Sequence, residues 1–427
     1  MLTEKDLSRN RFYYIIEAAV EYFISLLITG AFLATLLTRS GVSDAATGVI
    51  TQLASLAFTA QLFSVFFRKT RGMKRFVTIM HVVNQLMFVS LYMIPTFQVP
   101  PAIKTTCFVV LFLGGHLVSN IVSPYKLSWL MSFVPNNRRG RFTASKENVS
   151  LLGGMGFSMA MGALIEHTTA IGKEDLGFTL CGITILVLTG IHFLTLVLIR
   201  DHEPDPDAVS GHVSFDTVKK TVTNTVILKI IAVDIIWHLA TGIAVSYYGV
   251  YQTGDLGFSL RYASFVSILS SLSRVAVSRL FGKIADKYSW TRLLTMCFAI
   301  AALSFGVNIF TVPSNGHVMF VIYSCIYAMS MAGINGGLMN IIFDFVPQSE
   351  RPAALGIKYS VGGLAGFFAS LVGSLIVTTI QKNGNTFLGM SLYAQQLLSV
   401  IALVICIVLV IYMRVVITKL KANKDGQ

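Results

Sequence analysis

Residues 225–251, TVILKIIAVDIIWHLATGIAVSYYGVY, form a long apolar stretch in which only Lys229, Asp234 and His238 can carry a charge. A helix needs about 20 mostly apolar residues to cross a hydrocarbon core about 30 Å thick. The stretch exceeds this length, so we predict a membrane-spanning helix. The apolar residues of a spanning helix say little about function, whereas its few charged residues are candidates for a functional role.

The rest of the chain repeats this pattern. Of its 427 residues, 54% are hydrophobic and 12% are charged, whereas about a quarter of the residues of a typical soluble domain are charged. We therefore predict an all-α polytopic membrane protein with about twelve transmembrane helices. The predicted spans are 12–37, 46–67, 76–96, 102–134, 148–170, 176–199, 225–251, 259–281, 293–313, 316–346, 357–380 and 390–417.

The basic residues predict the orientation of these spans. Lys and Arg gather in the connections at 68–75, 138–146 and 279–292, whereas the alternate connections hold few of them. Cytoplasmic loops retain Lys and Arg, so this alternation predicts that both termini are cytoplasmic. The net charge of +13 is thus spread among short connections, and we expect no nucleic-acid partner. We expect a multi-pass protein of the cytoplasmic membrane.

The chain also divides into two similar halves. The only long polar connection predicts a first domain of six helices at 1–200, a cytoplasmic linker at 201–220 and a second six-helix domain at 221–427. The sequence Phe-Val-Pro at 133–135, followed by Lys146, recurs at 345–347, followed by Lys358. Parallel repeats around a central site are common among transporters.

The segment 282–294, GKIADKYSWTRLL, resembles the G-x-L-A-D-R-x-G-R-K-x-x-L loop signature of the major facilitator superfamily. Gly282 and Asp286 match the signature, Lys287 replaces its first arginine with another basic residue, and Ser289 replaces its second glycine. The resemblance implies two six-helix domains around a pathway that the first, fourth, seventh and tenth helices line. It also implies that Gly282, Asp286 and Lys287 belong to a loop that acts in the conformational switch.

Charged residues within the spans are candidates for ion coupling. A charge at the bilayer centre costs about 2.5–3.5 kcal/mol on insertion scales, so such residues usually face the interior of the bundle. Glu17 and Glu21 lie four residues apart, hence on one face of the first helix, and Asp234 and His238 do so on the seventh. Lys126 on the fourth helix could offset a glutamate. We prefer Glu21 and Asp234 as coupling residues, with Glu17, His238 and Lys126 assisting them.

Two of these assignments have plain alternatives. Glu17 could lie at the cytoplasmic interface, and Lys126 could extend its ammonium group to the lipid headgroups. His81 and His192 fall on helices that the resemblance places away from the pathway, so we expect structural roles for them.

The presumed lining helices also carry aromatic and amide side chains. Trp237 could stack on the face of a sugar ring, and a site of rings and amides suits a neutral polar solute. The substrate-binding candidates are Trp237, His116, Asn120, Tyr323, Tyr327 and Asn335.

We expect no enzymatic activity, cofactor or metal site. The sequence has no G-x-x-x-x-G-K-[ST] phosphate loop and no H-E-x-x-H motif, and its five cysteines lack metal-ligand spacing. The expected function is secondary active transport of a small solute across the lipid bilayer, with proton-coupled uptake of a neutral polar solute such as a sugar. A multidrug or metabolite exporter of the same fold and a non-transporting membrane sensor stay open as alternatives.

Overall fold

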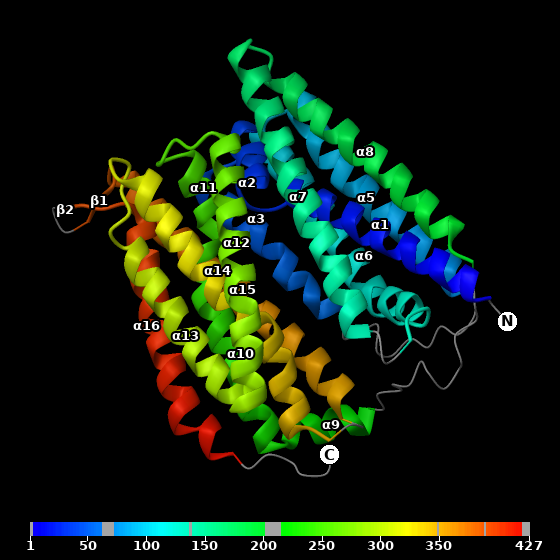
Figure 1. Cartoon of the computed structure of the whole chain (residues 1–427). Coiled ribbons are helices and arrows are strands. Elements are labelled where there is room, and N and C mark those ends of the chain that lie inside the picture. Colours follow the sequence, from blue (N-terminus) through cyan, green and yellow to red (C-terminus); the bar gives the residue numbers. More distant parts are fainter. Residues whose placement is uncertain are drawn as a thin grey trace. The chain divides into compact units, whose positions relative to one another are not determined.

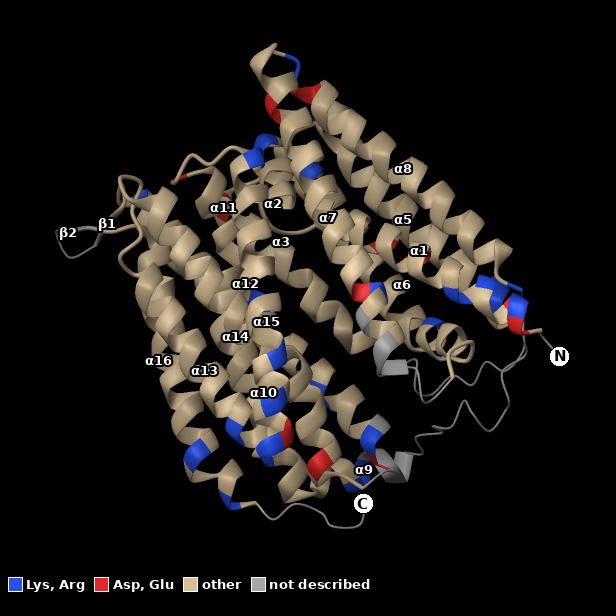
Figure 2. Cartoon of the chain, in the orientation of Figure 1, with Lys and Arg blue, Asp and Glu red and all other residues tan. Residues whose placement is uncertain are grey.

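The structure is a computed structural model of the whole chain, and it describes residues 3–61, 72–135, 139–200, 215–347, 350–387 and 390–420 (Figure 1). The described part is almost wholly helical, and its one sheet is a hairpin of β1 (Thr386–Phe387) and β2 (Met390–Ser391). Most of the helical length carries no charged side chain (Figure 2). A backbone in lipid must satisfy its hydrogen bonds internally, which helices do.

Ten helices of the described residues are long and apolar enough to cross a membrane. An eleventh span is the bent pair α1 (Glu4–Leu27) and α2 (Gly30–Arg39), which meet at 43°. Gly30 takes a φ of +56° at this break, a conformation that glycine adopts at little cost. The predicted second span begins as α3 (Asp44–Leu56) and continues toward 62–71, which lies outside the described residues. The prediction of an all-α polytopic membrane protein is confirmed.

The contacts divide the chain into two compact units. Unit 1 comprises Met1–Ser43, Phe67–His212 and Ser259–Ser264. Within it α1 packs against α7 and α8, and α5 packs against α6 and α8. Its remaining long helices are α5 (Met73–Met93), α6 (Pro101–Met131), α7 (Arg139–Ala170) and α8 (Glu174–Leu198).

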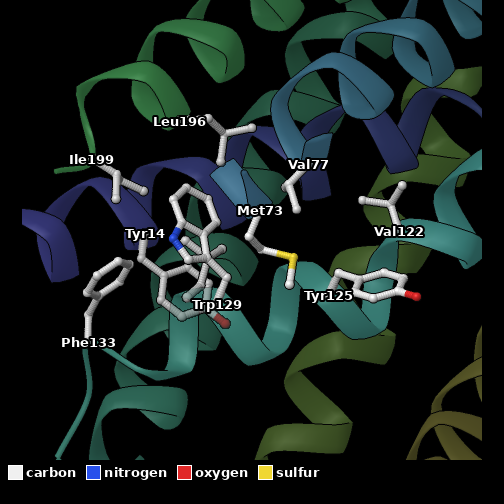
Figure 3. Close-up of a cluster of buried hydrophobic side chains, with 10 residues drawn as sticks. Tyr14, Met73, Val77, Val122, Tyr125, Trp129, Phe133, Leu196 and Ile199 are labelled. Carbon is white, nitrogen blue, oxygen red and sulfur yellow. The ribbon is translucent and has the colours of Figure 1, made fainter. Parts of the chain in front are cut away.

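Unit 1 contains a core of buried aromatic and aliphatic side chains (Figure 3). Trp129 on α6 is fully buried there, and its ring meets Phe133 edge-on at 5.9 Å between centroids. Tyr14 from α1 and Leu196 from α8 complete the contact between helices that are distant in sequence. This core fixes α1, α6 and α8 against one another, which matters because each carries a residue of the site described below.

Unit 2 comprises Asp44–Phe66, Val213–Phe258 and Phe265–Gln427. In this unit α10 packs against α15 and α16, α13 packs against α14 and α16, and α3 packs against α15. The predicted linker falls largely on 201–214, outside the described residues, so the division at 201–220 stays a prediction. The helices of this unit are α3, α9 (Phe215–Thr223), α10 (Thr225–Ala244), α11 (Tyr248–Thr253), α12 (Leu260–Lys287) from Phe265 onward, α13 (Trp290–Asn308), α14 (Gly316–Phe345), α15 (Arg351–Lys382) and α16 (Ala394–Val415).

Candidate functional site

Unit 1 contains a buried charge cluster that joins three of the predicted coupling residues. Glu17 on α1 is 0% exposed, and its Oε1 lies 3.0 Å from the Nζ of Lys126 on α6. The same ammonium group also pairs with Glu21, one helical turn further along α1. Lys126 therefore bridges both carboxylates inside the unit, and its ammonium group is held by Glu17 and Glu21.

Two histidines complete this cluster. His192 on α8 places its Nε2 3.0 Å from Glu17 Oε1, and its Nδ1 is bonded to the side-chain nitrogen of Gln85 on α5. His81 on α5 places its Nδ1 3.9 Å from Glu21 Oε1. We name Glu17, Glu21, His81, Lys126 and His192 the unit 1 cluster. It draws one or two residues from each of four helices.

The sequence reasoning set His81 and His192 aside as structural. A usable signal existed, because a titratable residue within a membrane span is a functional candidate by default. Structural roles were expected for both histidines because the family resemblance assigns the pathway to other helices. The structure instead places both rings against the carboxylates of α1.

The unit 1 cluster has an unbalanced charge. With both histidines neutral, its two carboxylates face one ammonium group. The two carboxylates also differ in access: the Glu17 side chain is 1% exposed and the Glu21 side chain is 37% exposed. Glu21 is therefore the more accessible of the two carboxylates, whereas Glu17 is enclosed by Lys126 and His192.

Unit 2 contains a second, smaller group, which we name the unit 2 cluster: Asp234, His238 and Lys358. Asp234 on α10 is 0% exposed, and its Oδ1 lies 3.1 Å from the Nζ of Lys358 on α15. His238 Nδ1 lies 3.3 Å from Asp234 Oδ2 and 2.8 Å from the backbone oxygen of Asp234. With His238 neutral, one carboxylate thus faces one ammonium group, and the charges balance.

Lys358 was not predicted as a partner for Asp234, because it lies at the very start of the predicted span 357–380. The structure places it inside α15 with 2% exposure. A glycine makes the approach possible: a Cβ at Gly362 would lie 2.2 Å from Asp234 Oδ2. The Asp234 carboxylate occupies the space that any other side chain would need.

The predicted substrate residues of unit 2 form a stack of rings. Trp237 is 4% exposed, and its ring stacks on Tyr327 at 6.4 Å between centroids. Tyr327 in turn stacks on Tyr323 at 5.8 Å. Asn335 lies two to three turns further along α14 and is exposed. The Trp237 ring is thus largely covered by its own unit.

The predicted substrate residues of unit 1 lie on α6. His116 packs against the rings of Phe112 and Phe88, at 4.5 Å and 5.1 Å between centroids. Asn120 donates a hydrogen bond to the backbone oxygen of His116, one turn earlier. The assignment of all six residues to substrate binding stays a prediction.

The predicted switch loop is mostly helical. α12 continues through Gly282 and Asp286 to Lys287, and α13 begins at Trp290. The expected loop is thus a connection of two residues, with Asp286 and Lys287 exposed in the last turn of α12. Ser289, which replaces the second glycine of the family signature, accepts a hydrogen bond from the backbone nitrogen of Arg292. A serine is favoured here because it caps the next helix.

The described residues include no group of three or more His, Cys, Asp or Glu side chains that could hold a metal ion. The carboxylates, lysines and histidines of the two clusters can bind a proton, form ion pairs and exchange partners. The unit 1 cluster is suited to all three, since its two carboxylates face one ammonium group and Glu21 is partly exposed.

Comparisons with known proteins give a consistent picture. A comparison with curated proteins finds no match. Among solved structures, a variant of the nucleoside transporter NupG matches with a TM-score of 0.74 at 13% identity, over 95% of this chain and 99% of that chain. A D-xylose-proton symporter matches with a TM-score of 0.67 at 14% identity, over 93% of this chain and 96% of that chain. A bacterial homologue of the lysosomal transporter Spinster matches with a TM-score of 0.66 at 15% identity, over 96% and 97% of the two chains.

These likenesses show the fold, and the family is shown by the sequence itself. The family model of the Major Facilitator Superfamily matches residues 14–370, which include both charge clusters. This chain therefore belongs to the Major Facilitator Superfamily and is a membrane transporter of that family.

Proposed function

We propose that this transporter couples the uptake of a neutral polar solute, such as a sugar or a nucleoside, to the entry of a proton. The observation that carries the proposal is the charge of the unit 1 cluster, where Glu17 and Glu21 share the single ammonium group of Lys126. One proton neutralises this cluster. Burying a net charge in a low-dielectric interior is costly, so the protonated cluster is the form that is easier to enclose.

Glu21 is the residue that accepts this proton. Its side chain is 37% exposed, whereas that of Glu17 is 1% exposed and is held by both Lys126 and His192. When Glu21 is protonated, Lys126 pairs with Glu17 alone. The cluster then has two arrangements that differ by one proton and by the partner of one ammonium group, which is what a coupling site requires.

The available driving force is sufficient. One charge that moves through about 100 mV gains about 2.3 kcal/mol, which corresponds to a roughly fiftyfold accumulation of a neutral solute. A pH gradient adds to this gain. No other energy source is needed for uptake.

A neutral solute is the better fit because the buried charges of unit 2 cancel. Asp234 and Lys358 are the buried ion pair there, so the unit 2 cluster offers no net charge to an ionic solute. The ring stack of Trp237, Tyr327 and Tyr323 supplies apolar faces and hydroxyl groups. The similarity in fold to a nucleoside transporter and to a D-xylose-proton symporter supports the same choice.

The test is uptake into vesicles reconstituted with the purified full-length chain. A panel of radiolabelled pentoses, hexoses and nucleosides is offered with and without an imposed inward proton gradient. We expect accumulation of at least one solute that depends on the gradient. Glu21→Gln should abolish this dependence while exchange of labelled for unlabelled solute continues. The matched control is Glu166→Gln, an exposed glutamate on α7 of the same unit, which should behave as the wild type.

Two results would overturn the proposal. Gradient-driven accumulation that survives Glu21→Gln would remove Glu21 from coupling. Outward movement of lipophilic cations, with no uptake of any solute in the panel, would favour an exporter of the same fold.

A further inference from the structure

His192 lies between a carboxylate and a carboxamide, in the interior of unit 1. It is 1% exposed, its Nε2 is 3.0 Å from Glu17 Oε1, and its Nδ1 is bonded to the side-chain nitrogen of Gln85. An amide nitrogen can only donate, so Nδ1 accepts this bond and carries no proton. The proton of the neutral ring is therefore on Nε2, which donates to Glu17.

Gln85 could equally well hold the doubly protonated ring. Its side-chain oxygen is buried and has no hydrogen-bond partner among the described residues. A rotation of the carboxamide by half a turn would bring this oxygen to Nδ1, where it would accept a bond from a protonated nitrogen. The rotation exchanges one hydrogen bond for another, so both protonation states of His192 can be satisfied at this position.

We infer that His192 is a second proton-binding residue of the unit 1 cluster. Gln85 turns its side-chain nitrogen toward His192 when Nδ1 is bare and its side-chain oxygen toward His192 when Nδ1 is protonated. This inference rests on the proposed function, because it names where the coupling proton can be held. The proton adds to Nδ1, and no covalent bond other than the new N–H changes. The imidazolium then forms an ion pair with Glu17, which leaves Lys126 to pair with Glu21.

His81 provides a link between the exposed carboxylate and His192. Its ring is 2% exposed, and neither of its nitrogens has a hydrogen-bond partner among the described residues. Its Nδ1 is 3.9 Å from Glu21 Oε1, and its ring centroid is 5.2 Å from that of His192. A small movement of the ring would let it accept a proton from Glu21 on one nitrogen and release one from the other, as histidine shuttles do.

The charged and titratable groups around His192 come from every helix packed against it. α1 contributes Glu17 and Glu21, α5 contributes His81, and α6 contributes Lys126. On the side of α7, Lys146 lies 5.1 Å from the ring centroid of Tyr14. The two carboxylates favour the imidazolium, whereas Lys126 opposes it. Protonation of His192 is therefore coupled to whether Lys126 pairs with Glu17 or with Glu21.

The experiment is nitrogen NMR of the full-length chain, labelled with ¹⁵N-histidine and embedded in bilayers of phosphatidylethanolamine and phosphatidylglycerol. His192 is identified by the signals lost in His192→Gln, and His167→Gln, an exposed position on α7, is the control for assignment. We expect one protonated and one bare nitrogen at high pH and two protonated nitrogens at low pH. This measurement needs no solute, so its failure is distinct from a failure of proton-coupled uptake.

Two variants of Gln85 make the inference falsifiable. Gln85→Glu offers a carboxylate to Nδ1 and should move the change to higher pH by about one unit or more, as nearby opposite charges do. Gln85→Met offers no acceptor and should move it to lower pH. A His192 that keeps one bare nitrogen between pH 4.5 and 9, or a titration that neither variant moves in purified, monodisperse protein, would overturn the inference.

Discussion

The two units solve the same problem, a buried carboxylate, in different ways. In unit 2, Asp234 is fully enclosed and pairs with Lys358, whereas in unit 1 two glutamates share Lys126 and one of them is partly exposed. Both groups begin with a pair spaced four residues apart on the first helix of a half. From this difference we propose that the balanced, closed pair stabilises the fold and that the unbalanced, partly exposed group binds and releases the proton, whereas the predicted coupling role of Asp234 stays untested.

The lysines show how the two halves have diverged. Lys358 and Lys146 occupy corresponding places after the repeated Phe-Val-Pro sequence. Lys358 pairs with Asp234, but Lys146 lies over the ring of Tyr14, and Lys126 from a different helix serves the glutamates instead. The two halves therefore share the repeated sequence and its helices but differ in their ion pairs.

The largest expected effect comes from breaking the balanced pair. Lys358→Met leaves Asp234 fully buried with only His238 beside it, and removal of one partner of a buried ion pair typically costs about 3–5 kcal/mol of stability. Thermal unfolding of the purified protein in detergent should show a large fall in the midpoint. Adding Asp234→Asn to this variant should restore most of the loss, and a single variant as stable as the wild type would contradict the description of this pair.

The coupling role of unit 1 predicts the next largest effect. Glu21→Gln should remove the proton-driven part of accumulation, about fiftyfold at 100 mV, with little effect on the unfolding midpoint because the Glu21 side chain is partly exposed. The measurement is the ratio of internal to external solute at steady state. A fall in stability as large as that of Lys358→Met would show that the two clusters differ less than we propose.

A smaller effect is expected where the backbone approaches Asp234. Gly362→Ala would place a Cβ 2.2 Å from Asp234 Oδ2 and 3.0 Å from His238 Nδ1, and such overpacking costs about 1–3 kcal/mol. The matched control is Gly156→Ala on α7, where a Cβ meets nothing within 4 Å. Equal unfolding midpoints for the two variants would argue against the close packing of α10 on α15.

The smallest effect lies outside the spans, at Asp255 in the connection between α11 and α12. Burial, together with the nearby charge of Asp44, raises the pKa of the Asp255 carboxyl to about 6. A carboxyl whose folded pKa is raised contributes stability that is present below its ordinary pKa and is lost as pH rises toward 6. Screening by water limits the effect to about 1 kcal/mol. Asp255→Asn should reduce the dependence of the thermal unfolding midpoint on pH between pH 4 and 6. A variant whose midpoint changes with pH as steeply as that of the wild type would contradict this assignment.

Much of the fold follows from the sequence because the bilayer imposes a simple rule of length and polarity. The apolar stretches predicted the membrane helices, and the spacing of Glu17 and Glu21 predicted that they share a face. The bend before α2 was not predicted, because Gly30 is one of many glycines in the spans and only its backbone angle marks it. The second predicted span could be checked only in part, since it runs outside the described residues.

The sites were harder to predict because a sequence gives the helix of a residue but not its partner. The prediction that Lys126 could offset a glutamate agrees with its contacts to Glu17 and Glu21, and the role of the three residues in ion coupling stays a prediction. Lys358 was missed since it follows a basic connection, and His192 was missed since the family resemblance gave its helix a peripheral role. In both cases the deciding fact is the packing of α15 on α10 and of α8 on α1, which only the structure supplies.

The most direct test of the difference between the clusters is proton movement driven by solute alone. Vesicles that hold a pH-sensitive dye, with no imposed gradient, receive a solute identified by the uptake panel. Wild-type protein, and the variant that combines Asp234→Asn with Lys358→Met, should acidify the lumen as the solute enters, whereas Glu21→Gln should not. Acidification that persists in Glu21→Gln, and is lost only when the Asp234 pair is removed, would contradict the account.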